Sequence, residues 1–291
     1  MRHSRHRPSG WGGARTWRNH VATRPVVSVV VPTKNVERTM DRCLRSIAGQ
    51  SWEATELVVI DNFSDDRTFE IAQQYADIAV QAGPERSAQR NLGIEKATGD
   101  YILWIDADMV LTPHVLEDAV LAAERTGSTA VFIPEETVGE GFLTACRTLE
   151  RKCYVGEEMI EAPRLIRRDF FTEHGGFVLT VAGQEDADLR MRLLRSGARM
   201  THIDATILHD EGRLTFGDVM RKRYYYGQSL PAYNDAQPGA IRAQGVATVK
   251  AYARGLPTLA GDPIHAVALG GLRVAEAVAY ALGAAKATRA R

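Results

Sequence analysis

Short apolar runs alternate with amphipathic stretches through the first third of the chain. The first run, residues 26–31, is rich in valine and ends at Pro32, which is typical of a strand buried on both faces of a parallel sheet. After it, Met40, Leu44 and Ile47 share one face of a predicted helix. The same pattern predicts strands at 56–60 and 101–105, a short apolar piece at 78–80, and helices at about 67–76 and 87–97. This alternation indicates a doubly wound α/β sheet.

Polar residues follow the predicted strands at the end where such sheets bind their ligands. These strand ends comprise residues 32–35, 61–66 and 106–108. Neither a G-x-G-x-x-G nor a G-x-x-x-x-G-K-[ST] sequence follows the first strand, which argues against a Rossmann dehydrogenase and a P-loop enzyme. Asp106 and Asp108 are one residue apart just beyond a buried strand. Both carboxylates can therefore reach one hard cation, Mg²⁺ or Mn²⁺, of the kind that neutralises substrate phosphates.

Composition and charge exclude several protein classes. The 291 residues include 36 Lys and Arg against 36 Asp and Glu, with 45 % hydrophobic residues, so the chain is an ordinary globular protein without the basic field of a dedicated nucleic-acid binder. The three cysteines, Cys43, Cys146 and Cys153, have no metal-like spacing, and their odd number argues against a disulfide framework. This cysteine usage indicates a reduced, cytosolic environment.

The two ends of the chain differ in character from its middle. Residues 1–24 contain arginines but no acidic residue and lack the apolar run of a signal peptide, which predicts a disordered basic tail. A weak tether to anionic lipid is the alternative for this tail. Residues 264–285 are the most apolar stretch, but Arg273 and Glu276 interrupt it. We therefore expect an amphipathic helix there, buried or on a surface, rather than a membrane-spanning helix.

Several motifs that occur in one order resemble the family-2 glycosyltransferases of the GT-A fold. The matching stretches are residues 27–35, 58–66, 90–93, 99–101, 106–108 and 183–189. An isolated D-x-D sequence arises by chance in acidic loops, whereas the ordered set is specific. The resemblance implies a nucleotide-binding, mostly parallel sheet flanked by helices over residues 25–215. A helical C-terminal extension over residues 216–291 would wrap the acceptor, touch the membrane, or be buried against the core or a partner subunit.

The resemblance also implies roles for particular residues. Those expected at the nucleotide, ribose or diphosphate are Pro32, Thr33, Asp61, Arg90, Asp106, Arg221 and Arg223. Those expected at a divalent metal, Mn²⁺ or Mg²⁺, are Asp106, Asp108 and His209. Each also has a purely structural use that stays open: Asp61 as a turn former, the D-x-D pair as a solvated turn, the arginines as helix surface, and His209 as a hydrogen-bonded structural histidine.

A predicted helix that begins at Glu185 carries the expected general base. By resemblance, Asp186 would remove the proton from the acceptor hydroxyl, with Glu185 and Asp188 as alternatives. Stabilisation of the helix dipole by acidic residues in the first turn is the structural alternative. Farther along, leucines give this helix an apolar component, and Arg190 belongs to its basic component.

Together these features predict an inverting glycosyltransferase that moves a sugar from a nucleotide-sugar donor, UDP-linked rather than GDP-linked, to a hydroxyl of a saccharide, lipid-linked or other acceptor. We expect a role in cell-envelope, exopolysaccharide or glycolipid synthesis, in the cytoplasm or peripherally at the inner face of the cell membrane. No nucleic acid is expected as a partner, and a homodimer stays open. The alternatives are a nucleotidyltransferase acting on a sugar phosphate, which needs glycines that residues 33–37 lack, and a non-catalytic nucleotide-binding scaffold protein.

Overall fold

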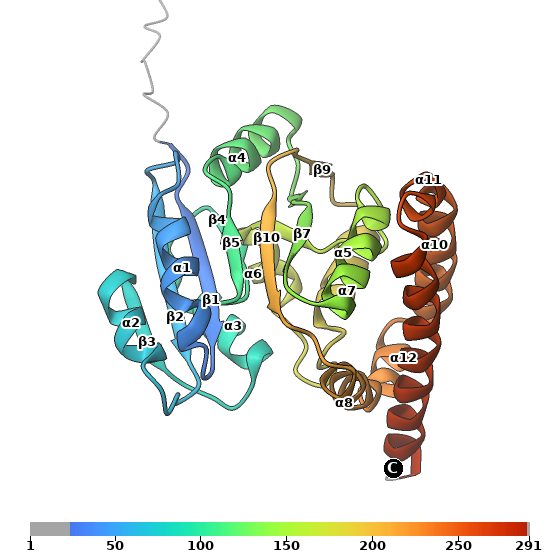
Figure 1. Cartoon of the computed structure of the whole chain (residues 1–291). Helices are drawn as coiled ribbons and strands as arrows, with labels where there is room; N and C mark the ends of the chain where they lie inside the picture. Colours follow the sequence, from blue (N-terminus) through green and yellow to red (C-terminus); the bar gives the residue numbers. More distant parts are fainter. Residues whose placement is uncertain (1–23, 290–291) are drawn as a thin grey trace, which may run out of the picture.

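A seven-stranded sheet forms the centre of the protein. The computed structural model describes residues 24–289 (Figure 1), so the predicted basic tail, apart from Arg24, lies outside the described residues. In sheet order the strands are β3 (Ile78–Gln81), β2 (Thr55–Asp61), β1 (Val27–Thr33), β4 (Tyr101–Trp104), β8 (Pro163–Arg167), β6 (Ala130–Phe132) and β9 (Met200–His202). Strand β8 is antiparallel to both neighbours and the other pairs are parallel, so the expected mostly parallel sheet is confirmed.

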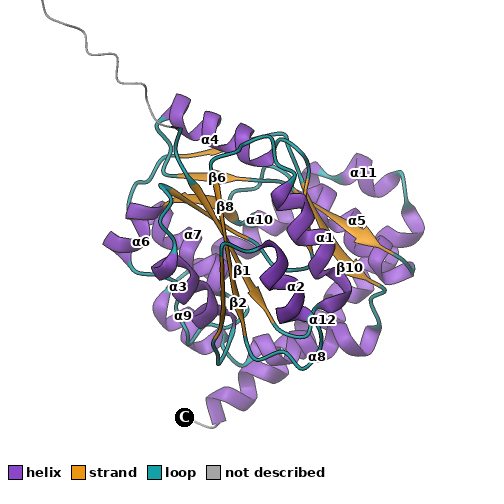
Figure 2. Cartoon of the chain, turned by 90° about the vertical axis from the view of Figure 1, so that its left-hand side faces the viewer, coloured by secondary structure: helices purple, strands orange, loops and turns teal. Residues whose placement is uncertain are grey.

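Helices cover both faces of this sheet because successive side chains of a strand point to opposite faces. Val29 and Val31 of β1 pack in one apolar cluster with α1 (Glu37–Ala48), α2 (Thr68–Tyr75) and α4 (Val115–Thr126). Val30 packs in a second cluster with α3 (Arg86–Lys96), α6 (Arg168–His174) and α7 (Glu185–Arg195). Figure 2 shows α1 and α2 on one side of the sheet and α3, α6 and α7 on the other. The helices predicted at 67–76 and 87–97 are thereby confirmed to within about a residue.

A second, three-stranded sheet begins directly after the D-x-D sequence. It contains β5 (Met109–Leu111), β10 (Ile207–Gly212) and β7 (Glu135–Gly139), in that order. Strand β10 pairs antiparallel with β5 and parallel with β7. Helix α5 (Phe142–Tyr154) packs against β7. This small sheet was not predicted, and it brings His209 opposite Met109, one residue beyond Asp108.

The described C-terminal residues form five helices, of which the last three pack on α5 and the first two pack on the last. They are α8 (Phe216–Gly227), α9 (Leu230–Ala236), α10 (Ala240–Arg254), α11 (Leu256–Ala260) and α12 (Pro263–Arg289). Helix α12 runs along α8 and α5 (Figure 1). The two helix backbones of α8 and α12 touch at glycines, since a Cβ on Gly227 would lie 2.3 Å from the Tyr280 carbonyl oxygen and a Cβ on Gly283 would lie 2.2 Å from that of Tyr224.

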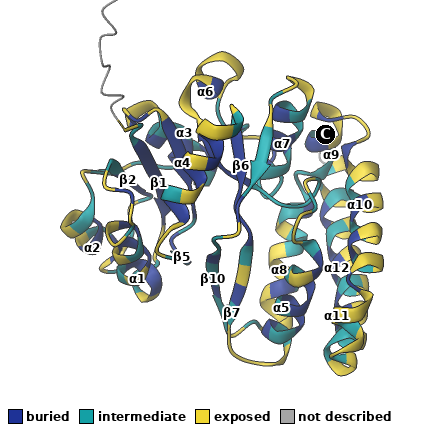
Figure 3. Ribbon diagram, turned by 90° about the horizontal axis from the view of Figure 1, so that it is seen from above, coloured by how far each residue is buried: buried dark blue, intermediate teal, exposed yellow. Residues whose placement is uncertain are grey.

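Helix α12 turns Arg273 and Glu276 toward the protein and exposes many of its apolar residues. Glu276 is buried and accepts hydrogen bonds from Arg147 of α5 at 2.5 Å and from Arg223 of α8 at 2.9 Å. Among the described helices it alone is long and apolar enough to cross a membrane, yet only 28 % of its most apolar window is buried. Figure 3 shows exposed residues along its outer side. The predicted helix at 264–285 is confirmed, and its two interrupting charges are packed against the protein.

Candidate functional site

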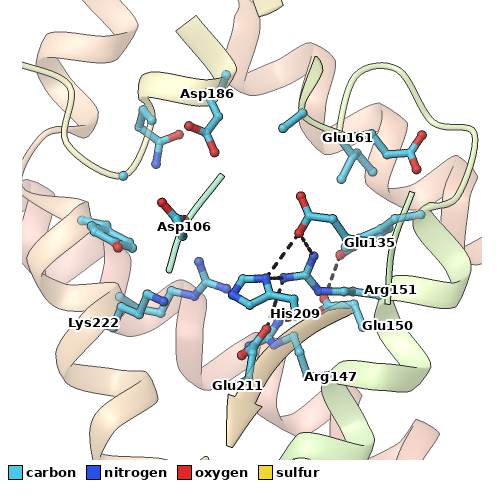
Figure 4. Close-up of a pocket in the computed structure, with 18 of the residues that line it drawn as sticks. Asp106, Glu135, Arg147, Glu150, Arg151, Glu161, Asp186, His209, Glu211 and Lys222 are labelled. Carbon is cyan, nitrogen blue, oxygen red and sulfur yellow. Dashed lines mark hydrogen bonds and ion pairs between the residues drawn. The ribbon is translucent and has the colours of Figure 1, made fainter. Parts of the chain in front are cut away.

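A cavity of about 520 Å³ lies among the turn after β4, the small sheet, the start of α7 and the C-terminal helices. Its wall includes Asp106, Glu135, Asp186, Arg190, His209, Lys222, Arg223, Gln244 and Arg273. Figure 4 shows Asp106, Glu135, Asp186 and His209 around the same open space, with Lys222 at its edge. Residues that lie far apart in the sequence therefore meet here, and three C-terminal helices, α8, α10 and α12, supply part of the wall.

Arg90 does not line the cavity but lies behind its polar wall, where it pairs with three carboxylates that do. It is completely buried, although it is a charged residue on α3, and its guanidinium lies 4.5 Å from the Trp104 ring centroid. It donates to Asp106 at 2.6 Å, to Asp186 at 3.2 Å and to Glu185 at 3.3 Å. The interpretation of Arg90 as a helix surface charge is therefore wrong, because its packing and its three ion pairs join α3, α7 and the turn after β4.

The three acidic residues of the first turn of α7 have different surroundings. The side chain of Glu185 is only 2 % exposed and accepts from Arg86 at 2.5 Å, and that of Asp188 is 2 % exposed and accepts from Arg192 and Gln237. The carboxylate of Asp186 is 37 % exposed and lines the cavity. Of the three candidate bases, only Asp186 presents a carboxylate to a ligand.

The pKa of Asp186 is raised above its ordinary value. Burial is the main cause, because it disfavours the ionised carboxylate. Arg90 opposes this rise, whereas the negative charge of Glu185 adds to it. A carboxylate whose pKa lies nearer to neutrality is a better proton acceptor for a hydroxyl than an ordinary aspartate.

The two aspartates of the D-x-D sequence face different partners. Asp106 is held by Arg90 at 2.6 Å and by Arg86 at 3.6 Å. Burial favours its neutral form, but these arginines outweigh burial and lower its pKa well below the ordinary range. Asp108 instead has its Oδ2 3.4 Å from Nε2 of His209, while its Oδ1 is buried without a hydrogen-bond partner. Asp106 is thus held in an ion-pair network, whereas the side chain of Asp108 is 39 % exposed.

His209 connects Asp108 to a buried charge network in the small sheet. Its Nδ1 lies 3.3 Å from Glu135 and 2.8 Å from Nη2 of Arg151. Burial opposes protonation of the imidazole, but the hydrogen bonds to Asp108 and Glu135 outweigh it and raise the pKa of His209 to about 9.

The side chains of the site can hold a divalent cation together with a bound substrate. They do not form a complete metal site on their own. No group of three His, Cys, Asp or Glu side chains that could hold a metal occurs within residues 24–289. Asp108 and His209 are adjacent, and the unpartnered Oδ1 of Asp108 is a free oxygen donor. Asp106 is occupied by arginines, so the predicted set of three ligands is not brought together. One carboxylate and one imidazole, completed by phosphate oxygens, is a donor set that suits Mn²⁺, and binding of the metal would displace the proton that Asp108 and Glu135 stabilise on His209.

The residues predicted at the nucleotide base and ribose are buried in the structure. Pro32, Thr33 and Asp61 do not line the cavity, and Asp61 is fully buried. Its oxygens accept hydrogen bonds from the Thr33 hydroxyl and the Ser64 amide, both at 2.9 Å, and from Gln81 at 3.1 Å. The turn-forming interpretation describes Asp61 in this structure, and direct contact with a nucleotide requires one of these bonds to open.

The two arginines of α8 that were predicted to bind the diphosphate lie on different faces of the helix. Arg221 is 80 % exposed, pairs with Asp218 and does not line the cavity. Arg223 lines the cavity while donating to Glu276. Lys222 also lines the cavity, although it was not singled out from the sequence. The structure therefore removes Arg221 from the candidate site and adds Lys222.

Sequence reasoning also missed buried charges that shape the wall. Arg164 of β8 lies 4.2 Å from the Trp104 ring centroid and donates to Glu135 at 2.8 Å. Arg151 of α5 pairs with Glu135 and Glu211. The available signal was an arginine within an otherwise apolar strand, because a buried charge requires partners. Its partners lie on other elements, which the sequence does not reveal.

Comparison with known proteins agrees with the fold. The sequence profile described as Glycosyl transferase family 2 matches residues 28–175. The glycosyltransferase EpsJ of Bacillus subtilis is 30 % identical over 155 residues, which cover 51 % of this chain and 42 % of that protein. The matched segments span less than half of the length of the curated relatives that match first.

Two solved structures share the fold. The mannosyltransferase PcManGT from Pyrobaculum calidifontis, in complex with GDP-Man and Mn²⁺, superposes with a TM-score of 0.63 and 20 % identity, covering 92 % of this chain and 88 % of that one. Residues 1–349 of S. aureus TarS, in complex with UDP-GlcNAc, superpose with a TM-score of 0.52 and 18 % identity, covering 91 % of this chain and 92 % of that fragment. The expected GT-A type of α/β fold is confirmed.

Proposed function

The chain belongs to glycosyl transferase family 2, and on this premise we propose that it moves a sugar from a nucleotide-sugar donor to an acceptor hydroxyl with inversion at the anomeric carbon. The new bond joins the acceptor oxygen to the anomeric carbon while the bond from that carbon to the diphosphate oxygen breaks. The proton passes to a carboxylate, and the electron pair leaves with the nucleoside diphosphate.

The position of Asp186 is the main support for this proposal. Glu185 also borders the cavity but its side chain is only 2 % exposed, whereas the side chain of Asp186 is 37 % exposed and lies 3.2 Å from Arg90. The raised pKa of Asp186 suits a general base. Glu185 and Asp188 are buried against arginines and a glutamine, which supports a structural role for both.

The cations of the cavity wall support binding of the diphosphate. Arg86 and Lys222 line the cavity, and neither is completely enclosed by protein. A divalent cation, Mn²⁺ or Mg²⁺, held by Asp108 and His209 would supply positive charge to the leaving diphosphate. The fold neighbours were solved with GDP-Man and with UDP-GlcNAc. We retain a UDP-sugar as the expected donor, with a saccharide or another hydroxyl compound of the cell envelope as the acceptor.

Calorimetric titration of UDP and GDP, with and without Mn²⁺, tests the donor half of the proposal. We expect metal-dependent binding that Asp108→Asn abolishes and that Asp186→Asn retains. Asp186→Asn should slow release of the nucleoside diphosphate from the matching sugar nucleotide by about 10²- to 10⁴-fold, the usual contribution of a general base. The matched control is Asp204→Asn, an exposed aspartate outside the cavity.

Two outcomes would contradict the proposal in different ways. Absence of nucleotide binding under every metal condition would refute nucleotide-sugar chemistry altogether. Tight nucleotide binding with no release from any sugar nucleotide would instead favour the non-catalytic scaffold.

The outer face of α12 supports a position at a membrane surface. We define this outer face by its exposed apolar residues, which are Ile264, Val267, Val274, Val278 and Leu282. The exposed basic residues Lys286 and Arg289 continue it toward the C-terminus. Apolar side chains beside basic ones match the interface of an anionic bilayer. We propose that this face rests on the inner surface of the cell membrane, where a lipid-linked acceptor would be found.

Flotation of the full chain with vesicles of phosphatidylglycerol and phosphatidylcholine tests the membrane contact. The double variant Val267→Asp and Val278→Asp should lower vesicle binding at least about tenfold, since each charge must enter the interface. Val155→Asp, at an exposed valine outside α12, is the matched control. Unchanged binding of the double variant would contradict the proposal, and a dimer that the double variant abolishes would identify a second copy as the occupant.

A further inference from the structure

One buried arginine in the cavity wall has no carboxylate partner. The buried arginines of the described chain are Arg90, Arg147, Arg164 and Arg190. The first three form ion pairs with carboxylates, but no carboxylate of residues 24–289 lies within ion-pair distance of Arg190. The sequence placed Arg190 in the basic component of α7, and the structure instead buries it to 3 % exposure.

The hydrogen bonds of Arg190 do not include an anionic partner. Its Nη1 donates to the carbonyl oxygens of Ile160 at 3.2 Å and Glu161 at 3.1 Å, whereas its Nε has no partner. Burial lowers the pKa of its guanidinium, although Tyr233 and Asp186 oppose that effect. A buried cation without a counter-ion is unfavourable, and a ligand anion in the cavity would remove that penalty.

The position of Arg190 relative to Asp186 indicates which substrate brings the anion. Both line the cavity, and they lie four residues apart on α7, so their Cα atoms are separated by about 6 Å along the helix axis. The start of α7 faces Arg86 and Arg90, next to Asp106. Arg190 therefore lies beyond the base along α7, on the side away from the ion pairs that Arg86 and Arg90 form.

The wall around Arg190 is suited to a polar ligand. Gln244 and Thr248 of α10 line the same cavity with neutral hydrogen-bonding groups. Gln244 donates to the hydroxyl of Tyr233 at 2.7 Å, which orders this part of the wall. Amide and hydroxyl groups of this kind can form hydrogen bonds with sugar hydroxyls.

We propose that the acceptor carries a phosphate or carboxylate group that pairs with Arg190 while its hydroxyl meets Asp186. This inference rests on the proposed function, because it assigns the acceptor of the same reaction. Arg190 is a specificity-determining residue in this arrangement: an acceptor without the anion would leave the guanidinium buried and unpaired.

Thermal unfolding with inorganic phosphate as the probe tests the anion site. The full chain is first saturated with UDP or GDP and Mn²⁺, so that the diphosphate groups are occupied, and phosphate is then compared with chloride at equal ionic strength. We expect phosphate to raise the melting temperature of the wild type and of Arg195→Gln, an exposed arginine on the same helix. Arg190→Gln should lose this rise and keep its nucleotide affinity.

The thermal unfolding measurement is then repeated with a sugar nucleotide whose sugar is uncharged, in place of the nucleoside diphosphate. This comparison shows whether the anion belongs to the acceptor or to the donor sugar. Retention of the phosphate effect supports an acceptor site, whereas its loss would place the anion on the donor sugar and overturn the proposal. A phosphate effect that survives in Arg190→Gln, or is absent from the wild type, also overturns it. Failure of the nucleotide itself to bind would count against the proposed function, and the phosphate titration without nucleotide would still report on Arg190.

Turnover provides a second readout. Acceptor pairs that differ only in the anion, such as N-acetylglucosamine and its 6-phosphate or glucose and glucuronate, are compared by stimulated release of nucleoside diphosphate. We expect kcat/KM at least about tenfold higher for the anionic member, with the preference lost in Arg190→Gln, partly kept in Arg190→Lys and unchanged in Arg195→Gln. Equal use of both members by the wild type would refute the inference.

Discussion

Replacement of Arg90 by methionine should destabilise the protein strongly, because this arginine is the cation shared by three carboxylates. Its guanidinium is completely buried and pairs with Asp106, Asp186 and Glu185 at 2.6, 3.2 and 3.3 Å. Methionine retains much of the apolar contact with the Trp104 ring but leaves Glu185, 2 % exposed, with Arg86 as its remaining ion-pair partner. Removal of one partner from a buried ion pair costs about 3–5 kcal/mol.

This cost converts to a measurable change in melting temperature. With an unfolding entropy of roughly 2.1 cal/mol/K per residue, a chain of 291 residues loses about 1.6 °C for each kcal/mol. Arg90→Met should therefore unfold about 5–8 °C below the wild type in differential scanning calorimetry. Arg67→Met is the matched control, because Arg67 is 62 % exposed and solvent screens its surface ion pairs.

A second mutation distinguishes the two possible causes of the destabilisation, the loss of ion pairs and the loss of packing against Trp104. If the loss arises from unpaired carboxylates, adding Glu185→Gln to Arg90→Met should cost less than the sum of the two single changes. An Arg90→Met variant no less stable than Arg67→Met would refute the reasoning that Arg90 holds the site together. Strict additivity of the double variant would assign the loss to packing against Trp104 instead.

Three further predictions follow from other parts of the structure. Burial favours the neutral form of Glu276, but the surrounding arginines lower its pKa from 4.5 to about 2. The ionised carboxylate therefore stabilises the folded protein above about pH 4.5, and this stabilisation is lost as pH falls toward 2. Glu276→Gln should thus cost about 3 kcal/mol at pH 7 and converge with the wild type in acid, as measured by urea unfolding. Because the pKa of Asp186 is raised partly by Glu185, turnover should fall on acidification, and Glu185→Gln should move that fall to lower pH. Gly93→Ala should cost about 1–3 kcal/mol in urea unfolding, since its Cβ would lie 2.4 Å from a β1 side chain; Gly217→Ala, whose Cβ meets open space, should not destabilise.

The central sheet could be predicted because its pattern is local. The valine run of β1 and the apolar strands β2 and β4 alternate with amphipathic helices, and each observed element lies within a few residues of its predicted position. The small sheet could not be predicted. Its strands are short and carry polar residues such as Glu135 and His209, and β10 pairs with β5 across about 100 residues of sequence. Neither periodicity nor length marks such strands.

The motifs likewise indicated where the site lies in the sequence, but not which of their residues face the cavity. Glu185, Asp186 and Asp188 are alike in sequence, and only the rotation of α7 against its neighbours buries two of them and opens the third to the cavity. The same holds for Arg221, which faces solvent, and Lys222, which faces the cavity.

Hydrophobic periodicity and chain order were enough to predict the α/β class, the order of the elements and the strand ends where polar residues gather. Which charges are buried, which find partners and which are left for a ligand depends on how the elements pack in three dimensions. Arg90 and Arg190 are both helical arginines, yet one meets three carboxylates and the other none. The energy of a charge depends on the groups that surround it in space, and those groups come from segments that are distant in the chain.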